Sequence, residues 1–261
     1  MARGPRDGRM PLREHLVELR RRLVLAAVGI AVGAVIGWLI YQPIFEVLQE
    51  PLLDVAAERG TTVALNFAGA MTALDMQLKM SVFLGVLVSS PWWLYQLWAY
   101  ITPGLTRRER LYSVGFVAAA VPLFLAGAAV AWWVLPRAVV LLVEFVPQGA
   151  LNIQDAQGYL GFVMRIVLAF GIAFLLPVVM VALNLVGLVR ARTYLRAWRW
   201  AVVAAFTFAA MMTPTADVLT MFTLALPICG LYAIAVGVGF LHDRRADRRA
   251  ARLLAENEIP A

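Results

Sequence analysis

Six blocks of mostly apolar residues, separated by charged or proline-containing segments, set the pattern of this chain. The blocks cover residues 23–41, 80–101, 111–135, 162–186, 200–212 and 218–241. A helix needs about 20 mostly apolar residues to cross about 30 Å of hydrocarbon. The pattern therefore predicts an all-α integral membrane protein with six transmembrane helices. Pro136 and Arg137 are expected to end the third helix.

The fifth block is shorter than the others and is followed closely by the sixth. Its 13 residues extend only about 20 Å as a helix, and Thr213 and Pro214 end it. A tight turn from Thr213 to Asp217 then leads into residues 218–241. We expect these two spans to form a short hairpin, which local thinning of the bilayer accommodates.

Composition supports a polytopic membrane protein. Hydrophobic residues make up 62% of the 261 residues and charged residues 15%, whereas soluble domains carry about 25% charged residues. The mean hydropathy is +0.78. These values exclude a soluble enzyme, a disordered tail protein and a disulfide scaffold, and the single Cys229 cannot form an intrachain disulfide.

The distribution of charge predicts the orientation of the chain. Of the 23 basic residues, 19 fall in the two tails and in the loops after spans two and four, and 4 fall in the other loops. The acidic residues divide equally, so the formal net charge of +7 is about +11 on one side and −4 on the other. The positive-inside rule then puts both termini in the cytoplasm. The basic charge therefore reports orientation and not a nucleic-acid partner, and we expect one membrane domain with flexible tails at residues 1–10 and 242–261.

The loops on the opposite side are expected to hold short helices. Apolar residues alternate with acidic ones from Phe45 to Glu58 in a pattern typical of an amphipathic helix. In the first span, Gly29, Gly33 and Gly37 form a ladder of small residues on one helix face. Such a ladder allows close packing either against another helix of this chain or across a dimer interface.

The sequence gives little support to the hypothesis that this protein is an enzyme. His15 and His242 are the only histidines, and neither has a partner at metal-ligand spacing. Nucleotide-binding and hydrolase motifs are absent from the sequence, so no cofactor is expected. A proton-coupled secondary transporter of small molecules remains the alternative, although the spans are nearly free of the ionisable residues that such proteins carry at mid-membrane.

Two segments on the predicted cytoplasmic side contain isolated carboxylates among arginines. Residues 11–23 read PLREHLVELRRRL, in which Glu18 lies one helical turn from both Glu14 and Arg22. Between spans two and three, Glu109 is the only acid among Arg107, Arg108 and Arg110. By themselves these patterns are equally typical of solvated helix faces with local ion pairs.

Several ordered motifs resemble the TatC family, the polytopic subunits of the twin-arginine protein translocase. Residues 15–22 are similar to its N-terminal signature, and SSPWWLYQLWAYITPGLTRRER at 89–110 is similar to its second span and first cytoplasmic loop. Phe162 to Pro177 and the short fifth span ending at Thr213 and Pro214 match as well. The resemblance runs from about residue 10 to residue 241.

The resemblance implies a non-enzymatic receptor and translocase core in the bacterial cytoplasmic membrane. Such a protein exports folded proteins with the single-span partners TatA and TatB, uses the proton-motive force, and forms a homo-oligomer in the receptor complex. Carried over by motif, Glu18 and Glu109 contact the paired arginines of a signal peptide, and Arg20 and Tyr100 flank them. By the same resemblance, the residues expected to contact the partner helix are Met211, Met212, Thr213 and Asp217.

Two positions depart from the family pattern. Leu175 stands where a glutamate often follows the phenylalanine of span four, and Met221 replaces a common glutamine. The site for the partner helix is therefore expected to be more apolar here, with Asn184 or Arg165 as candidates to compensate.

Overall fold

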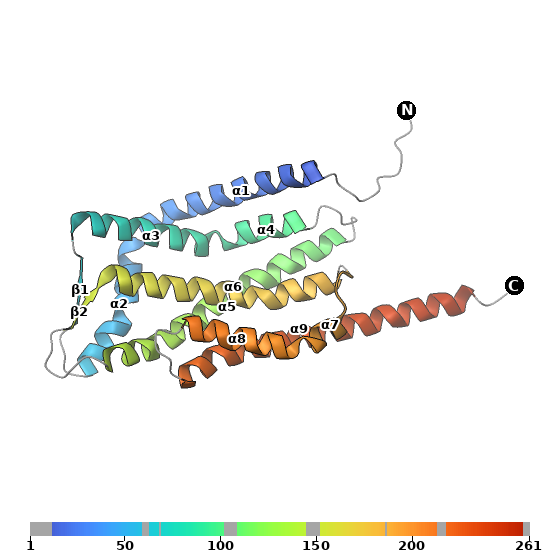
Figure 1. Ribbon diagram of the computed structural model, residues 1–261. Helices are drawn as coiled ribbons and strands as arrows, with labels where there is room; N and C mark the ends of the chain where they lie inside the picture. The colour runs from blue at the N-terminus through green and yellow to red at the C-terminus, as the bar shows by residue number, and fades with distance from the viewer. Residues whose placement is uncertain are drawn as a thin grey trace, which may run out of the picture. The chain divides into compact units, whose positions relative to one another are not determined.

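The computed structural model describes residues 12–58, 63–67, 69–101, 109–144, 152–185, 187–212 and 218–257. In these ranges the chain is helical except for one pair of short strands (Figure 1). The elements are α1 (Leu12–Leu39), α2 (Tyr41–Glu58), β1 (Val63–Asn66), α3 (Ala70–Val88), α4 (Ser90–Ile101), α5 (Glu109–Glu144), β2 (Asn152–Asp155), α6 (Ala156–Leu185), α7 (Ala191–Arg196), α8 (Trp198–Met212) and α9 (Val218–Asn257).

The structure falls into two compact units, which are described separately. The first lies within Met1–Glu50, Val63–Leu125 and Ile153–Met164, and the second within Pro51–Thr62, Ala126–Asn152 and Arg165–Ala261. Helices α2, α5 and α6 contribute residues to both units, and β1 pairs with β2.

Five helices in the described ranges are long and apolar enough to cross a membrane. These stretches are Arg13–Leu39, Met71–Val88, Gly115–Pro136, Ala156–Leu185 and Met221–Arg248. The fifth predicted span corresponds to α8, which is apolar but only 15 residues long. The hydrophobic pattern therefore located an apolar helix in every block, and the described residues supply five full-length candidates plus one short helix.

The glycine ladder of α1 packs inside the first unit against α3 and α4. A Cβ atom on Gly33 would lie 2.7 Å from the carbonyl oxygen of Gly85, and one on Gly37 would lie 2.9 Å from Cβ of Leu84. Side chains at these positions would clash, so the small residues allow the two helix backbones to approach closely. Of the two roles expected for the ladder, the structure shows packing within the chain.

The second predicted span is not one continuous helix. It begins ten residues earlier than expected, as α3, and is interrupted at Ser89 before α4. Pro91 explains the break, because it has no N–H to donate to the preceding turn and its ring would clash with the carbonyl of Leu87. The indole of Trp93 donates to the carbonyl of Val86 at 2.9 Å, which replaces part of the lost backbone bonding.

Two predicted helix ends were wrong. Helix α5 continues past Pro136 to Glu144. A proline inside a membrane helix removes only one backbone hydrogen bond, and membrane helices tolerate this loss. Helix α9 continues to Asn257 through most of the segment expected to be a tail. That segment is rich in alanine, arginine and leucine, which favour helix. Residues 1–10 and residues 213–217, where a tight turn is predicted, lie outside the described residues.

The predicted amphipathic helix after span one is present as α2. Leu48 and Leu52 on it are buried, whereas Leu53 is 45% exposed. Within the first unit, the hydroxyl of Tyr159 on α6 donates to the carbonyl of Leu48 at 3.1 Å. This contact fixes the first half of α2 against the start of α6.

Candidate ligand-binding site at the ends of α1 and α4

A carboxylate, a guanidinium and an amide meet where α1 faces α4. Arg22 Nε donates to Oε1 of Glu18 at 2.7 Å, and Arg22 Nη1 donates to Oε1 of Gln96 at 2.9 Å. Glu18 and Arg22 stand four residues apart on α1, so their side chains share one helix face. Each is 25% exposed, whereas Gln96 is buried. Gln96 thus holds Arg22 from the neighbouring helix, and Arg22 in turn orients Glu18.

Two further contacts extend this arrangement along both helices. The indole of Trp92 donates to the carbonyl of Leu25 at 2.8 Å. The hydroxyl of Tyr100 and Nε2 of His15 are hydrogen-bonded at 2.8 Å, with ring centroids 4.7 Å apart. Positions 92, 96 and 100 are spaced by one helical turn, and their partners on α1 run in the opposite direction. An antiparallel ladder of three polar contacts therefore joins α1 to α4 and positions Glu18.

The structure brings together some of the predicted peptide-binding residues. Glu18 and Tyr100 both belong to the ladder. Arg20 is exposed and lies about 200° around α1 from Glu18, so it faces another direction. Glu109 is the first residue of α5, and its side chain lies outside the part of the structure that is described.

The predicted partner-helix residues are described only in part. Met211 is 74% exposed at the end of α8, and Met212 beside it is half-buried. Thr213 and Asp217 fall within residues 213–217, which the structure does not describe.

Sequence reasoning missed His15, Arg22 and Gln96 as members of the site. Gln96 carried a usable signal, because an amide inside an apolar segment costs free energy unless it is hydrogen-bonded. Its partner was not visible in the sequence, since Arg22 lies 74 positions away.

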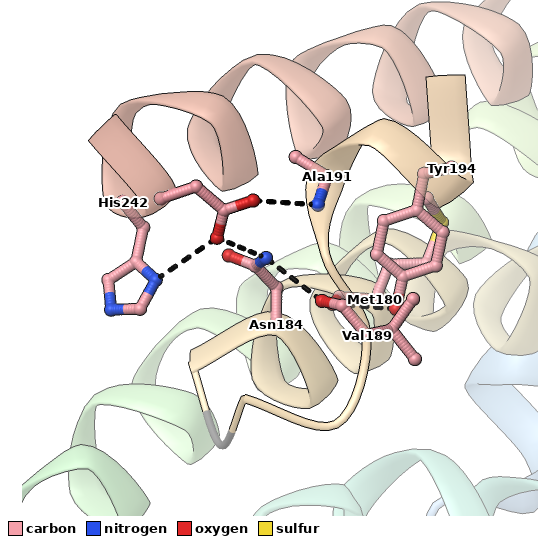
Figure 2. Close-up of polar contacts among 7 residues, drawn as sticks. Met180, Asn184, Val189, Ala191, Tyr194 and His242 are labelled. Atoms are coloured by element: carbon pink, nitrogen blue, oxygen red, sulfur yellow. Dashed lines mark hydrogen bonds and ion pairs between the residues drawn. The ribbon is translucent and has the colours of Figure 1, made fainter. Parts of the chain in front are cut away.

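A second polar cluster occurs in the other unit, where α6, α7 and α9 meet (Figure 2). Asn184 Nδ2 donates to Oδ1 of Asp243 at 2.9 Å and to the carbonyl of Val189 at 3.0 Å. The backbone N–H of Ala191 donates to Oδ2 of Asp243 at 2.8 Å. Asp243 therefore caps the first turn of α7 from a different helix, satisfying one of the amide groups that a helix start leaves open.

The local backbone makes this cluster possible. Gly187, with φ of 79°, turns the chain after α6, which returns Val189 to the side chain of Asn184. Tyr194 on α7 donates to the carbonyl of Met180 at 3.2 Å (Figure 2). Burial raises the pKa of Tyr194, and nearby Tyr232 adds to the effect, so this hydroxyl keeps its proton.

Asn184 is not placed to compensate for the glutamate that Leu175 replaces. Its amide is bound to the α7 and α9 cluster, and it lies nine residues from Leu175, about 13 Å along α6. The suggestion that Asn184 substitutes for a carboxylate at that position was therefore wrong.

The long apolar helices, with the ladder of polar contacts between α1 and α4, define a polytopic membrane protein. A family model described as "Sec-independent protein translocase protein (TatC)" matches residues 14–227. The chain belongs to the TatC family.

Curated relatives and solved structures agree. A TatC protein of Xylanimonas cellulosilytica is 58% identical over 251 residues, covering 95% of this chain and 91% of the relative. One from Rothia mucilaginosa is 36% identical and covers 95% of this chain and 85% of the relative. A crystal structure of the twin-arginine translocase receptor TatC in DDM aligns with a TM-score of 0.73 and 30% identity, covering 86% of this chain and 99% of that chain.

The family makes this chain a membrane-embedded component of a protein translocase, a non-catalytic transport protein that works with other Tat subunits. The comparisons favour this over the secondary transporter that the sequence left as the alternative.

Proposed function

We propose that this protein is the receptor and core subunit of a twin-arginine translocase in the bacterial cytoplasmic membrane, with both termini in the cytoplasm. It binds the paired arginines of signal peptides through Glu18 and Glu109. It organises single-span TatA- and TatB-type partners around Met211, Met212, Thr213 and Asp217, and folded proteins are exported at the expense of the proton-motive force.

The geometry of Glu18 is the observation that carries the proposal. Its Oε1 already accepts a hydrogen bond from the guanidinium of Arg22, so the carboxylate is held in an orientation that suits this kind of group. Among the described residues, Oε2 accepts no hydrogen bond, and the side chain is 25% exposed. A guanidinium from a ligand can therefore bind Oε2 while Arg22 keeps Oε1. Carboxylates bind guanidinium groups through strong, directional hydrogen bonds.

Two arginines in a signal peptide require more than one acceptor. Glu109 is another carboxylate among arginines on the predicted cytoplasmic side, and the resemblance assigns it as the second acceptor. Lysine is a point charge without the planar fork of arginine, so a twin-lysine peptide forms less directional hydrogen bonds with these carboxylates.

Peptide binding to the purified full-length protein tests the proposal. A fluorescent peptide with Arg-Arg is compared with its Lys-Lys counterpart by anisotropy. Glu18→Gln is expected to weaken Arg-Arg binding roughly tenfold or more, since a hydrogen bond to a charged group contributes about 1.5–3 kcal/mol. Glu14→Gln is the matched control, because Glu14 is exposed on α1 one turn before Glu18.

The result expected is a loss in Glu18→Gln and in Glu109→Gln, with Glu14→Gln close to the wild type. Equal affinities for the Arg-Arg and Lys-Lys peptides, or equal effects of Glu14→Gln and Glu18→Gln, would contradict the assignment.

A further inference from the structure

An apolar cavity of about 830 Å³ lies within the second unit, between α6, α8 and α9. Its lining consists of apolar side chains such as Ile172, Leu176, Val202 and Val236, and it contains no charged residue. Tyr232 brings a hydroxyl to the lining, but this hydroxyl donates to the carbonyl of Tyr194 at 2.6 Å. The cavity therefore offers an occupant apolar contact and no open hydroxyl group.

The cavity has the length of one membrane leaflet and opens at the side. Its lining runs from Ala169 to Met180 on α6 and from Trp198 to Phe208 on α8, about 16 Å at 1.5 Å per residue. That is about half of the 30 Å hydrocarbon thickness. Ile172 and Leu176 in the lining are each 57% exposed. Lipid can therefore reach the cavity from the bilayer.

Basic and aromatic side chains surround the end of the cavity nearest α7. Leu195 and Trp198 line this end, and Arg196 and Arg199 beside them are exposed. The guanidinium carbon of Arg199 lies 5.7 Å from the centre of the Trp198 ring. Tryptophan and arginine are typical of the membrane interface, where lipid phosphates lie. Positive charge thus stands where a lipid entering the cavity would carry its headgroup.

We propose that this cavity binds an anionic phospholipid, with an acyl chain between α6, α8 and α9 and the phosphate at Arg196 and Arg199. The positive charge at this end of the cavity favours a lipid phosphate over an apolar partner helix. The predicted partner residues Met211 and Met212 also stand at the opposite end of α8. A zwitterionic phospholipid fits the apolar cavity but brings no net charge to the two arginines.

Native mass spectrometry of the delipidated full-length protein tests this proposal. Phosphatidylglycerol and phosphatidylcholine with identical acyl chains are titrated, and the bound lipids are counted. Phosphatidylglycerol is expected to bind more tightly, and the double variant Arg196→Gln/Arg199→Gln is expected to weaken it by roughly fivefold for each arginine removed. Arg244→Gln/Arg245→Gln on α9 is the control for loss of charge alone, since both residues are exposed.

A second pair of variants tests the cavity. Ala204 lines it, whereas neighbouring Val203 is 56% exposed and does not line it. Ala204→Phe is expected to reduce binding of both lipids, and Val203→Phe is expected to leave it unchanged. Monodisperse elution in detergent shows that each variant is folded.

Retention of both lipids by Ala204→Phe would overturn the cavity as the site. Equal binding of the two lipids, or equal losses in the two arginine double variants, would overturn the headgroup assignment. Displacement of bound phosphatidylglycerol by a single-span partner peptide would also overturn the proposal, because it would make the cavity a helix site. Since no signal peptide is present, these results are independent of the proposed receptor function.

Discussion

Glu18 on α1 and Asp243 on α9 are equally exposed carboxylates with different uses. The side chain of each is 25% exposed. Both oxygens of Asp243 accept hydrogen bonds, one from the amide of Asn184 and one from the backbone N–H of Ala191. Among the described residues, only Oε1 of Glu18 accepts a hydrogen bond, and the donor, Arg22, is on the same helix. Exposure therefore does not separate a binding carboxylate from a structural one, whereas the number of occupied oxygens does.

The donors differ as well. Ala191 is fully buried and Asn184 is nearly so. Their N–H groups therefore cannot form hydrogen bonds with water if Asp243 is lost. Arg22 is itself 25% exposed and can exchange Glu18 for water at small cost. The comparison predicts that Asp243 contributes to stability and that Glu18 contributes to binding.

The largest expected effect is that of Asp243→Ala on stability. It leaves the N–H of Ala191 and the amide of Asn184 with fewer partners, and each buried group left unsatisfied costs about 1–3 kcal/mol. We expect the free energy of unfolding in detergent to fall by roughly 2–4 kcal/mol, measured by thermal unfolding.

Asp247→Ala is the matched control for this change, because Asp247 is an exposed aspartate one turn further along α9. It should unfold like the wild type, as should Glu18→Gln. If Glu18→Gln were as unstable as Asp243→Ala, the two carboxylates would share a structural role and the comparison would fail.

Much of this fold could be predicted from hydrophobicity, because span position is a local property of the chain. The start of α9 at Val218 and the end of α8 at Met212 agree with the predicted bounds. The break at Ser89 was missed because the residues on both sides are equally apolar and only Pro91 marks it. At Pro136 the error was the reverse: the sequence predicted a helix end there, but α5 continues through it.

The site could be predicted less fully, because its contacts join distant positions. Glu18 and Tyr100 were found through their motifs, but the pairing of Tyr100 with His15 spans 85 positions. Asp243 was missed altogether as the cap of α7. Periodicity reports which face of a helix is apolar, and it carries no information about which polar groups meet across two helices.

Changes at Gln96 are expected to have an intermediate effect, on peptide binding. Gln96 shares Arg22 with Glu18, so Gln96→Leu leaves Arg22 to bind Glu18 more completely. We expect the Arg-Arg peptide to bind about fivefold more weakly, the equivalent of about 1 kcal/mol, because the guanidinium of Arg22 then competes more strongly for the carboxylate of Glu18.

Gln96→Glu is the matching variant, and it is expected to change peptide affinity in the opposite direction. A carboxylate at this position holds Arg22 more strongly and releases Glu18, so peptide affinity should rise above that of the wild type. If both variants weakened binding equally, packing at this buried position would explain the loss, and competition for Arg22 would not.

The smallest expected effect is that of Tyr100→Phe. The ring remains against His15, at centroids 4.7 Å apart, and only the hydrogen bond to Nε2 is lost. Because this contact lies at the end of the ladder and does not touch Glu18, peptide affinity should fall no more than about threefold, within the 0.5–1.5 kcal/mol of one such bond. His15→Phe removes the same hydrogen bond from the other side, so the two single variants and the double variant should bind the peptide equally in the anisotropy assay. A much larger loss in Tyr100→Phe than in His15→Phe would mean that the tyrosine hydroxyl contacts the ligand directly, and the binding surface would then extend from Glu18 to the end of α4.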